Sequence, residues 1–249
     1  MTREVPRNMC GRYSIHRDQP ELRDSFDIKS GPEDIDWSAL EPRYNVAPTD
    51  QVLTVVGTDG DRHGAVMRWG RIPFWARDTK GARSMVDARG KTINTSINAR
   101  AETIDTARSF SGAFRNRRCL IPADGYYEWR GSKSARTPMY IYPKSREPFA
   151  MAGIWGTWRS PDGVATRSRA IIATVANSFM AEIHDRMPVM LTKGAESIWL
   201  EESNDIAELK ELLLPYPSHE MAAQAVSSLV NSVKIDSLEC TEPGSATLF

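Results

Sequence analysis

Five short segments of the chain gather reactive side chains beside glycine, proline and aromatic residues. They are Met9–Ser14 (MCGRYS), Arg43–Thr49 (RYNVAPT), Ile97–Thr103 (INARAET), Pro122–Trp129 (PADGYYEW) and His184–Leu191 (HDRMPVML). Together they supply a thiol, a carboxyl group, an imidazole, carboxamides and several guanidinium groups. These are the groups that nucleophilic and acid–base catalysis use, so the set is a candidate reactive site.

Taken one at a time, the same side chains have ordinary structural interpretations. Asn45 and Asn98 are typical turn formers, whose side chains bond to nearby backbone. Glu128 ends an expected strand and could simply face solvent, and His184 could cap the C-terminus of a short helix. The gathering of all of them in one chain is what favours chemistry.

The cysteine pattern singles out one thiol. Cys10, Cys119 and Cys240 are odd in number, widely spaced and without a C-x-x-C pair, which argues against a disulfide framework and a thiolate zinc site. Cys119 lies in the apolar stretch CLIPA and is predicted to be a small buried residue, whereas Cys240 lies in a polar tail and is predicted to be incidental. Cys10 stands apart, between Met9 and a glycine. We expect no metal and no cofactor.

Composition narrows the class of protein. The 32 basic and 32 acidic side chains give a formal net charge of zero, which argues against a histone-like coat on DNA but leaves room for a local basic groove. The basic run 115–118 is typical of a solvated face. Apolar runs fall far short of the roughly 20 residues that span a bilayer, and the N-terminus lacks the apolar segment of a secretory signal. We therefore expect a cytoplasmic protein, nucleoid-associated when bound to DNA, with no membrane partner.

Apolar and β-branched stretches bounded by turn residues predict many strands. They are Gln51–Val56, Gly64–Trp69, Cys119–Pro122, Tyr126–Trp129, Pro138–Tyr142, Phe149–Trp158, Arg169–Val175 and Pro188–Leu191. Helical spacing is rarer. It covers Asp18–Phe26, Ile104–Phe114, a short helix started by Asn177 or Ser178, Ala195–Leu200 and Asp205–Leu214. Strands and helices do not alternate, so the prediction is an α+β fold with a curved, mostly antiparallel sheet, an open barrel-like core and peripheral helices.

An ordered series of motifs resembles the SRAP domain family, also described as HMCES- or YedK-like proteins. The series comprises MCGRY, RYN-x-AP-T at Arg43–Thr49, WG-x-IP-x-W at Trp69–Trp75, NAR-x-E at Asn98–Glu102, CL-x-PA-x-G-x-YEW at Cys119–Trp129, HDRMP at His184–Pro188 and VN at Val230–Asn231. Any one motif is weak. The whole series, in the family's order over about residues 9–235, is very specific.

The resemblance implies that Cys10 acts as an N-terminal cysteine on abasic sites in single-stranded DNA. Its α-amine would condense with the open-chain aldehyde of the sugar, and its thiol would close a thiazolidine, giving a durable DNA–protein crosslink that shields the lesion. An α-amine and a thiol both have accessible nucleophilic forms near neutral pH. An internal cysteine lacks the amine and gives at most a reversible hemithioacetal.

The resemblance also implies roles for other residues. Asn98 would orient the amine or the sugar, Glu128 would act as general acid and base, and His184 would exchange protons with the sugar and assist crosslink reversal. Weak abasic-site lyase activity would accompany the imine. The residues expected to contact DNA, through phosphates or flanking bases, are Arg12, Asn45, Pro48, Trp75, Arg100 and Arg186.

The chain departs from the family pattern at its start, because eight residues precede Met9. Three accounts are open: translation begins at Met9, which we favour; the Cys10 site removes its own leader; or the leader persists and the protein binds DNA without crosslinking. The expected organisation is a leader over 1–8, one SRAP domain over 9–238 and a frayed tail over 239–249.

Functions of other classes remain as alternatives. A cysteine peptidase would use Cys10 as nucleophile, His184 as base and Glu128 to orient the base. A non-covalent reader of modified bases would stack them on Trp69, Trp75 or Trp129. A metal site made from Cys10, His184 and Glu128 has suitable residue types but no ligand spacing. A monomer is expected, and the sequence identifies no replication-fork partner.

Overall fold

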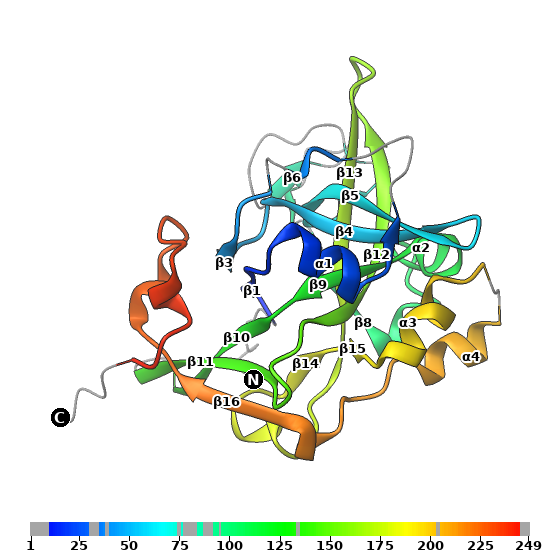
Figure 1. The fold of residues 1–249 in the computed structure, drawn as a ribbon. Helices are drawn as coiled ribbons and strands as arrows, with labels where there is room; N and C mark the ends of the chain where they lie inside the picture. Colours follow the sequence, from blue (N-terminus) through cyan, green and yellow to red (C-terminus); the bar gives the residue numbers. More distant parts are fainter. Residues whose placement is uncertain are drawn as a thin grey trace, which may run out of the picture.

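The computed structural model describes residues 10–29, 35–37, 40–73, 76, 84–86, 92–94, 96–132, 135–202 and 205–244. A β-barrel and a second, mostly antiparallel sheet make up most of the described chain, and short helices lie around them (Figure 1). The predicted α+β class with a barrel-like core and peripheral helices is confirmed. The barrel is closed rather than open.

Five strands form the barrel. They are β4 (Gln51–Thr58), β5 (Asp61–Trp69), β9 (Arg118–Ala123), β12 (Phe149–Arg159) and β13 (Ala165–Val175). Neighbours pair antiparallel in the order β13, β12, β9, β4 and β5, and a parallel pairing of β13 with β5 closes the ring. Aliphatic side chains suited to a pleated, buried surface fill it, and Leu120, Ile154 and Ile171 are fully buried.

The second sheet is joined to the barrel where β9 is followed in the chain by a strand of that sheet. Its strands, in spatial order, are β16 (Met221–Ala225), β11 (Ala135–Pro143), β10 (Gly125–Ser132), β1 (Tyr13–Ile15) and β3 (Arg43–Val46). Strand β9 of the barrel continues into β10 through Asp124. Gly125 is required at this corner because a Cβ there would lie 2.3 Å from the ring of Tyr140. One continuous segment therefore links the barrel to the sheet that carries Glu128.

Short strands flank β13 where it leaves the barrel. β8 (Asn98–Arg100) pairs parallel with it, and β14 (Arg186–Pro188) pairs antiparallel with it. The remaining short strands are β2 (Ile28–Lys29), β6 (Ser84–Val86), β7 (Thr92–Asn94) and β15 (Met190–Leu191). Two of the sequence motifs thus meet along β13.

The helices confirm some expectations and correct one. They are α1 (Gln19–Ser25), α2 (Ser111–Asn116), α3 (Lys193–Leu200) and α4 (Ile206–Glu211). Asp18 caps α1 by accepting from the Glu21 N–H at 2.9 Å. The long helix expected over 104–114 is wrong. A 3₁₀ turn precedes that stretch and α2 begins only at Ser111. Ile104 and Phe114 are both buried, but they lie on separate turns and not on one helix.

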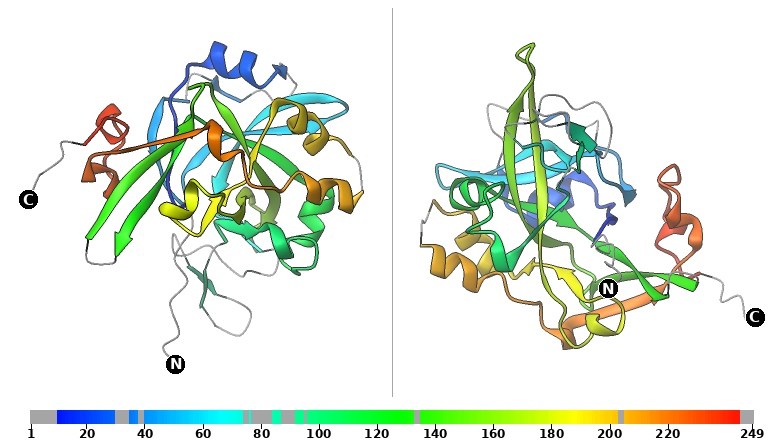
Figure 2. Two further views of the ribbon diagram at one scale, coloured as in Figure 1. Left: turned by 90° about the horizontal axis from the view of Figure 1, so that it is seen from below. Right: turned by 180° about the vertical axis from the view of Figure 1, so that it is seen from behind.

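The described part of the C-terminal segment contains short helical turns. Short 3₁₀ helices cover Ser228–Asn231 and Leu238–Cys240, and Val226 forms a bridge with Pro243. Cys240 is 0 % exposed and packs in a cluster of tyrosines from β10 and β11. Cys240 is therefore a buried core residue and not the incidental thiol expected from its place in a polar tail. Figure 2 shows this segment and the helices α3 and α4 on opposite sides of the barrel.

Among the described residues, no helix combines the length and the apolar character that crossing a bilayer requires.

Candidate functional site

Cys10 is separated from β1 by Gly11 and Arg12 and is 0 % exposed. Strand β1 pairs antiparallel with β10, with Tyr13 opposite Tyr126, and the Tyr127 N–H donates to the Arg12 carbonyl at 3.0 Å. This register carries the preceding residues along β10 toward Glu128. The Cys10 N–H donates to Glu128 Oε1 at 2.6 Å, so the nitrogen and the carboxyl group are in direct contact.

Glu128 is a buried carboxyl group, 2 % exposed. Burial raises its pKa to about 8, because the charged form loses its hydration, and the nearby charge of Asp185 adds to this effect. Hydrogen bonds from the backbone of Cys10 and Trp129 act in the opposite direction. Glu128 therefore holds a proton at neutral pH and can release it close to that pH, as a general acid and base must.

The Cys10 thiol lies in an environment that disfavours its ionised form. Burial raises its pKa well above the ordinary value, the Glu128 charge raises it further, and the charge of Arg169 opposes both. The backbone of Cys10 has a φ of 34°. That left-handed conformation is strained for a residue with a side chain, and such strain is commonly found at functional sites.

His184 approaches the same region through Met180. Tyr126, two residues before Glu128 on β10, donates from its hydroxyl to Met180 Sδ at 3.1 Å, and the His184 N–H donates to the Met180 carbonyl at 2.8 Å. His184 is 7 % exposed. Its Nδ1 accepts from the Arg186 N–H at 3.1 Å, which orients the ring. The charge of Asp185 also raises the pKa of Glu128.

Strand β13 holds Asn98 and two of the expected DNA-contacting arginines near one another. Asn98 is half-buried and pairs with Ile171, whereas Arg100 is exposed at the end of β8. Arg186 donates from two nitrogens to the carboxylate of Glu102, at 2.5 and 2.8 Å. The guanidinium of Arg186 thus already has an anionic partner within the protein.

The other residues expected to contact DNA differ in their exposure and in their partners. Arg12 is 9 % exposed and follows Cys10 closely, and Pro48 is half-buried in the turn before β4. Trp75 lies outside the described residues. Asn45 is 1 % exposed, and its Nδ2 donates to three backbone carbonyls within residues 230–235, at 2.7 to 3.3 Å. Asn45 therefore fastens the C-terminal segment and does not present its side chain to DNA.

Two buried residues, Tyr126 and Arg169, were not among the site residues predicted from the sequence. Tyr126 could have been identified, since it belongs to the PADGYYEW segment. Arg169 had none, because an arginine that begins an apolar run looks like the exposed start of a strand; in the structure it is 0 % exposed. Trp69 is 0 % exposed as well, so it cannot form the base-stacking pocket of the alternative hypothesis.

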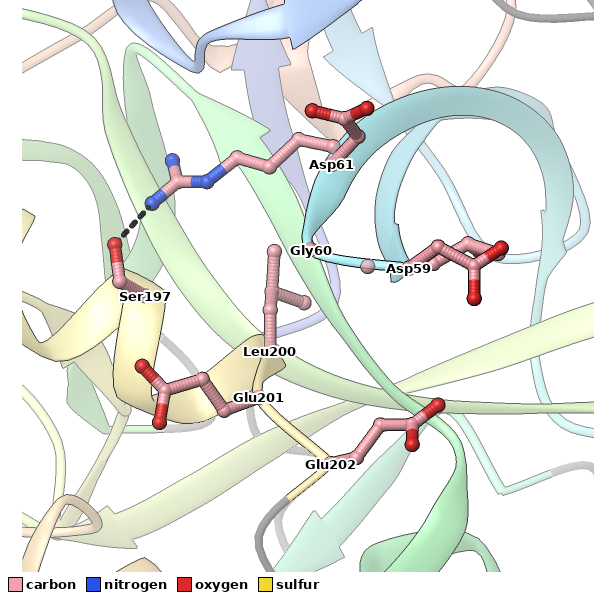
Figure 3. A pocket seen from close by; sticks show the side chains of 10 residues that line it. Asp59, Gly60, Asp61, Ser197, Leu200, Glu201 and Glu202 are labelled. Carbon is pink, nitrogen blue, oxygen red and sulfur yellow. Dashed lines mark hydrogen bonds between the residues drawn. The ribbon is translucent and has the colours of Figure 1, made fainter.

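A separate cavity of about 290 Å³ lies between the turn joining β4 to β5 and the end of α3 (Figure 3). Arg62 is one of its lining residues and donates to Ser197 Oγ at 2.9 Å. Its lining also carries four carboxylates, from Asp59, Asp61, Glu201 and Glu202. This surface repels phosphates, and none of the predicted site residues lines it. Within the described residues, no group of three histidine, cysteine or acidic side chains is arranged to hold a metal ion.

Comparison with known proteins gives consistent results. Residues 9–233 match the sequence profile described as SOS response associated peptidase (SRAP). "Abasic site processing protein YoqW" of Bacillus subtilis is 40 % identical over 237 residues, which cover 94 % of this chain and 99 % of that protein. "Abasic site processing protein YedK" of Escherichia coli is 28 % identical, over 94 % of this chain and all of that protein.

Solved structures of similar fold cover most of this chain. A protein from Bacteroides thetaiotaomicron superposes with a TM-score of 0.81 at 27 % identity, over 95 % of this chain and all of that one. A protein from Bordetella bronchiseptica gives 0.70 at 27 % identity, over 88 % of this chain and all of that one. The chain belongs to the SOS response associated peptidase (SRAP) family.

Proposed function

We propose that this chain processes abasic sites in single-stranded DNA and captures the opened sugar covalently through Cys10. Relatives that align over almost the whole chain are named abasic site processing proteins, which supports the substrate class. The observation that carries the chemistry is the 2.6 Å hydrogen bond from the Cys10 nitrogen to a buried carboxyl group whose pKa is about 8. When an amine adds to an aldehyde, the carbinolamine that forms must then lose water, and both steps need an acid–base group beside the nitrogen.

The reaction needs Cys10 as the first residue. Its amine adds to the sugar aldehyde, and a proton passes from nitrogen to oxygen through Glu128. Glu128 then protonates the hydroxyl of the carbinolamine, which leaves as water, and takes up the remaining N–H proton, so that an imine forms and the carboxyl group is restored. The thiol adds to the imine carbon, the sulfur–carbon bond forms, and the thiol proton moves to nitrogen. Aldehyde and aminothiol thus give a thiazolidine and one water.

The surrounding residues have supporting roles in this proposal. Asn98 orients the amine or the sugar, and His184 exchanges protons with the sugar oxygens and assists reversal of the crosslink. Arg12 and Arg100 hold phosphates beside the lesion, since guanidinium groups suit phosphate oxygens. Arg186 does so when phosphate displaces Glu102. The imine stage also gives weak abasic-site lyase activity.

Removal of residues 1–9 is part of the same proposal, because a peptide nitrogen at Cys10 cannot form an imine. Translation from Met9 followed by loss of that methionine is the simplest route. Self-processing is the second: the Cys10 thiol adds to the Met9 carbonyl carbon and its proton passes through Glu128 to the nitrogen as the carbon–nitrogen bond breaks. Water then hydrolyses the thioester, which releases the leader as a carboxylate and restores the Cys10 thiol. The strained φ of Cys10 and its bond to Glu128 favour this second route over persistence of the leader.

Incubation with single-stranded DNA that contains one abasic site tests the proposal. The protein is prepared with an N-terminus at Cys10, verified by intact mass, and a heat-stable shifted band is expected. Cys10→Ala should abolish the band, and undamaged DNA of the same sequence should give none. No band with a verified N-terminus, or an unchanged band with Cys10→Ala, would contradict the covalent mechanism. Repeated cleavage of added peptides without crosslinking would instead support a peptidase.

A further inference from the structure

Strand β1, which follows Cys10 closely, is three residues long, and backbone hydrogen bonds extend its pairing with β10 at both ends. The Tyr127 N–H donates to the Arg12 carbonyl at 3.0 Å, and the Asp124 N–H donates to the Ser14 carbonyl at 2.9 Å. A chain end is poorly ordered unless it is tied down. Once the leader is absent Cys10 is such an end, so its position depends on how firmly β1 is held.

Two carboxyl groups of the continuous β9–β10 segment bind backbone nitrogens on either side of β1 (Figure 1). Glu128 accepts from the Cys10 N–H at 2.6 Å. Asp124, which lies four residues earlier, accepts from the His16 N–H through Oδ2, also at 2.6 Å. Because β1 and β10 run antiparallel, these contacts lie at the two ends of one paired segment. Together they fix both the place and the direction of the chain that begins with Cys10.

Asp124 has the surroundings of a permanent anchor. It is 7 % exposed, and its second oxygen, Oδ1, accepts from Arg17 Nε at 2.8 Å. The same guanidinium donates from Nη2 to the Arg146 carbonyl at 2.6 Å, so the pair is held in one orientation. Glu128 differs, since a group that exchanges protons changes its bond to Cys10 during the reaction. The contact that persists through every step is the one at Asp124.

We propose that Asp124 is a positioning residue for the Cys10 amine: it fixes the far end of β1, so that the amine stays within reach of Glu128 after the leader is gone. This inference rests on the proposed function, in which that amine attacks the sugar aldehyde. No atom of Asp124 enters the reaction, and its partners stay the same throughout. Such positioning matters because a displacement of about 1 Å can cost on the order of 10²-fold in rate.

Hydrogen exchange of single amides, followed by NMR in the full chain, tests the anchor without DNA. The Tyr127 N–H reports on it, because its acceptor lies on the segment that precedes β1. Asp124→Ala leaves the His16 N–H without its acceptor, and exchange at Tyr127 should become about tenfold faster. The Val226 N–H donates to the Pro138 carbonyl at 3.0 Å on the far side of the same sheet and should keep its wild-type rate.

Crosslinking tests the consequence, in protein with a verified N-terminus at Cys10. In Asp124→Ala the maximal rate at saturating abasic DNA should fall by about 10- to 100-fold, whereas the DNA concentration that gives half this rate should stay unchanged. A purely structural role would alter neither quantity per folded molecule. Asp124→Asn leaves one oxygen for two donors, so exchange at Tyr127 and the crosslinking rate should each change by only about threefold.

Two controls separate positioning from a general loss of stability. Asp162→Ala removes an exposed carboxylate from the turn between β12 and β13 and should change neither measure. Asn45→Ala removes a different anchor of the second sheet and should leave crosslinking per folded molecule unchanged. A wild-type maximal rate in Asp124→Ala, or equally faster exchange at Tyr127 and Val226, would overturn the proposal.

If Asp124→Ala does not fold, Asp124→Asn decides, and a crosslinking rate equal to that of the wild type would again overturn the proposal. The two levels of inference fail separately. Wild-type protein with a verified N-terminus that never crosslinks abasic DNA contradicts the proposed function, and leaves the anchoring of β1 measured by exchange standing. Faster exchange at Tyr127 alone, with unchanged crosslinking, contradicts the role of Asp124 in the reaction.

Discussion

Asn45 and Glu128 are both polar, both almost inaccessible to solvent and both part of motif segments in the second sheet, yet their surroundings differ. The amide nitrogen of Asn45 donates to three carbonyls of residues 230–235. Glu128 instead accepts from the nitrogen of Cys10, and burial raises its pKa to about 8. One side chain is committed to holding backbone, and the other is held ready to exchange a proton.

A buried polar residue in a motif is therefore not by itself a sign of chemistry. Partners that are all backbone carbonyls indicate a structural role, because removing the side chain would leave those groups unsatisfied. A carboxyl group with a raised pKa beside a nucleophile indicates catalysis. The two regions should consequently respond to substitution in different measurements.

Glu128→Gln should have the largest effect on rate. It keeps the shape and an oxygen that can accept from Cys10, but cannot exchange a proton, so crosslink formation should slow by about 10²- to 10⁴-fold. In the wild type the pH profile of the rate should be bell-shaped, because the Cys10 amine must lose a proton to attack and Glu128, whose pKa burial raises to about 8, must keep one. Gel-based time courses at several pH values would check both points. A variant with wild-type rates and the same alkaline decline would remove Glu128 from the mechanism.

The same carboxyl group should make stability depend on pH. Its folded-state pKa of about 8 exceeds the ordinary value of about 4.3, so between these values the folded protein binds a proton that the unfolded chain releases. Stability should therefore fall as pH rises through this window, by on the order of a few kcal/mol, and the loss should be complete above about pH 8. Urea unfolding should show this slope in the wild type and a shallower one in Glu128→Gln. Parallel slopes would contradict a buried, neutral Glu128.

Asn45→Ala should lower stability without slowing crosslinking, the opposite of the effect on rate expected for Glu128→Gln. It leaves three carbonyls of the C-terminal segment without their donor, and should lower the free energy of unfolding by about 2 kcal/mol. Crosslinking per folded molecule should stay unchanged. Asn116→Ala, at an exposed position on α2, is the matched control and should change little. A large loss of crosslinking with intact stability would return Asn45 to the DNA-binding surface.

Arg186 should give the smallest effect, since its charge is shared with Glu102. Arg186→Gln should weaken binding to single-stranded DNA and reduce the slope of log affinity against log salt by about 0.7, the value for one phosphate contact. Glu102→Gln frees the guanidinium and should strengthen binding slightly. Fluorescence anisotropy at several salt concentrations would measure both. Equal slopes in wild type and Arg186→Gln would show that Arg186 makes no phosphate contact.

Much of the fold could be predicted from local pattern, because strands such as β4 and β12 are apolar runs bounded by turn residues. The closure of the barrel could not be. Arg68 and Trp69 pair with residues 168 and 169, a hundred positions later in the chain, and periodicity carries no information about such contacts. The spacing of Ile104 and Phe114 misled for a related reason, since two separate turns bury side chains at intervals that resemble one helix.

The candidate site shows the same limit. The residue types of Cys10, Glu128 and His184 pointed to acid–base and nucleophilic chemistry before any geometry was known. Their surroundings depend on tertiary contacts. The three carbonyls that engage Asn45 come from about 190 residues downstream, and the depth of Arg169 depends on the barrel seam. Side-chain type could be predicted to matter, but the partners of each group could not.

The mass of the adduct tests the central claim most directly. Protein that begins at Cys10 is incubated with single-stranded DNA carrying one abasic site, heated without reductant, and analysed by intact mass and peptide mapping. We predict a stable species equal to protein plus DNA minus one water, with the DNA attached to Cys10. No such species, or attachment at any other residue, would contradict covalent capture by an N-terminal cysteine.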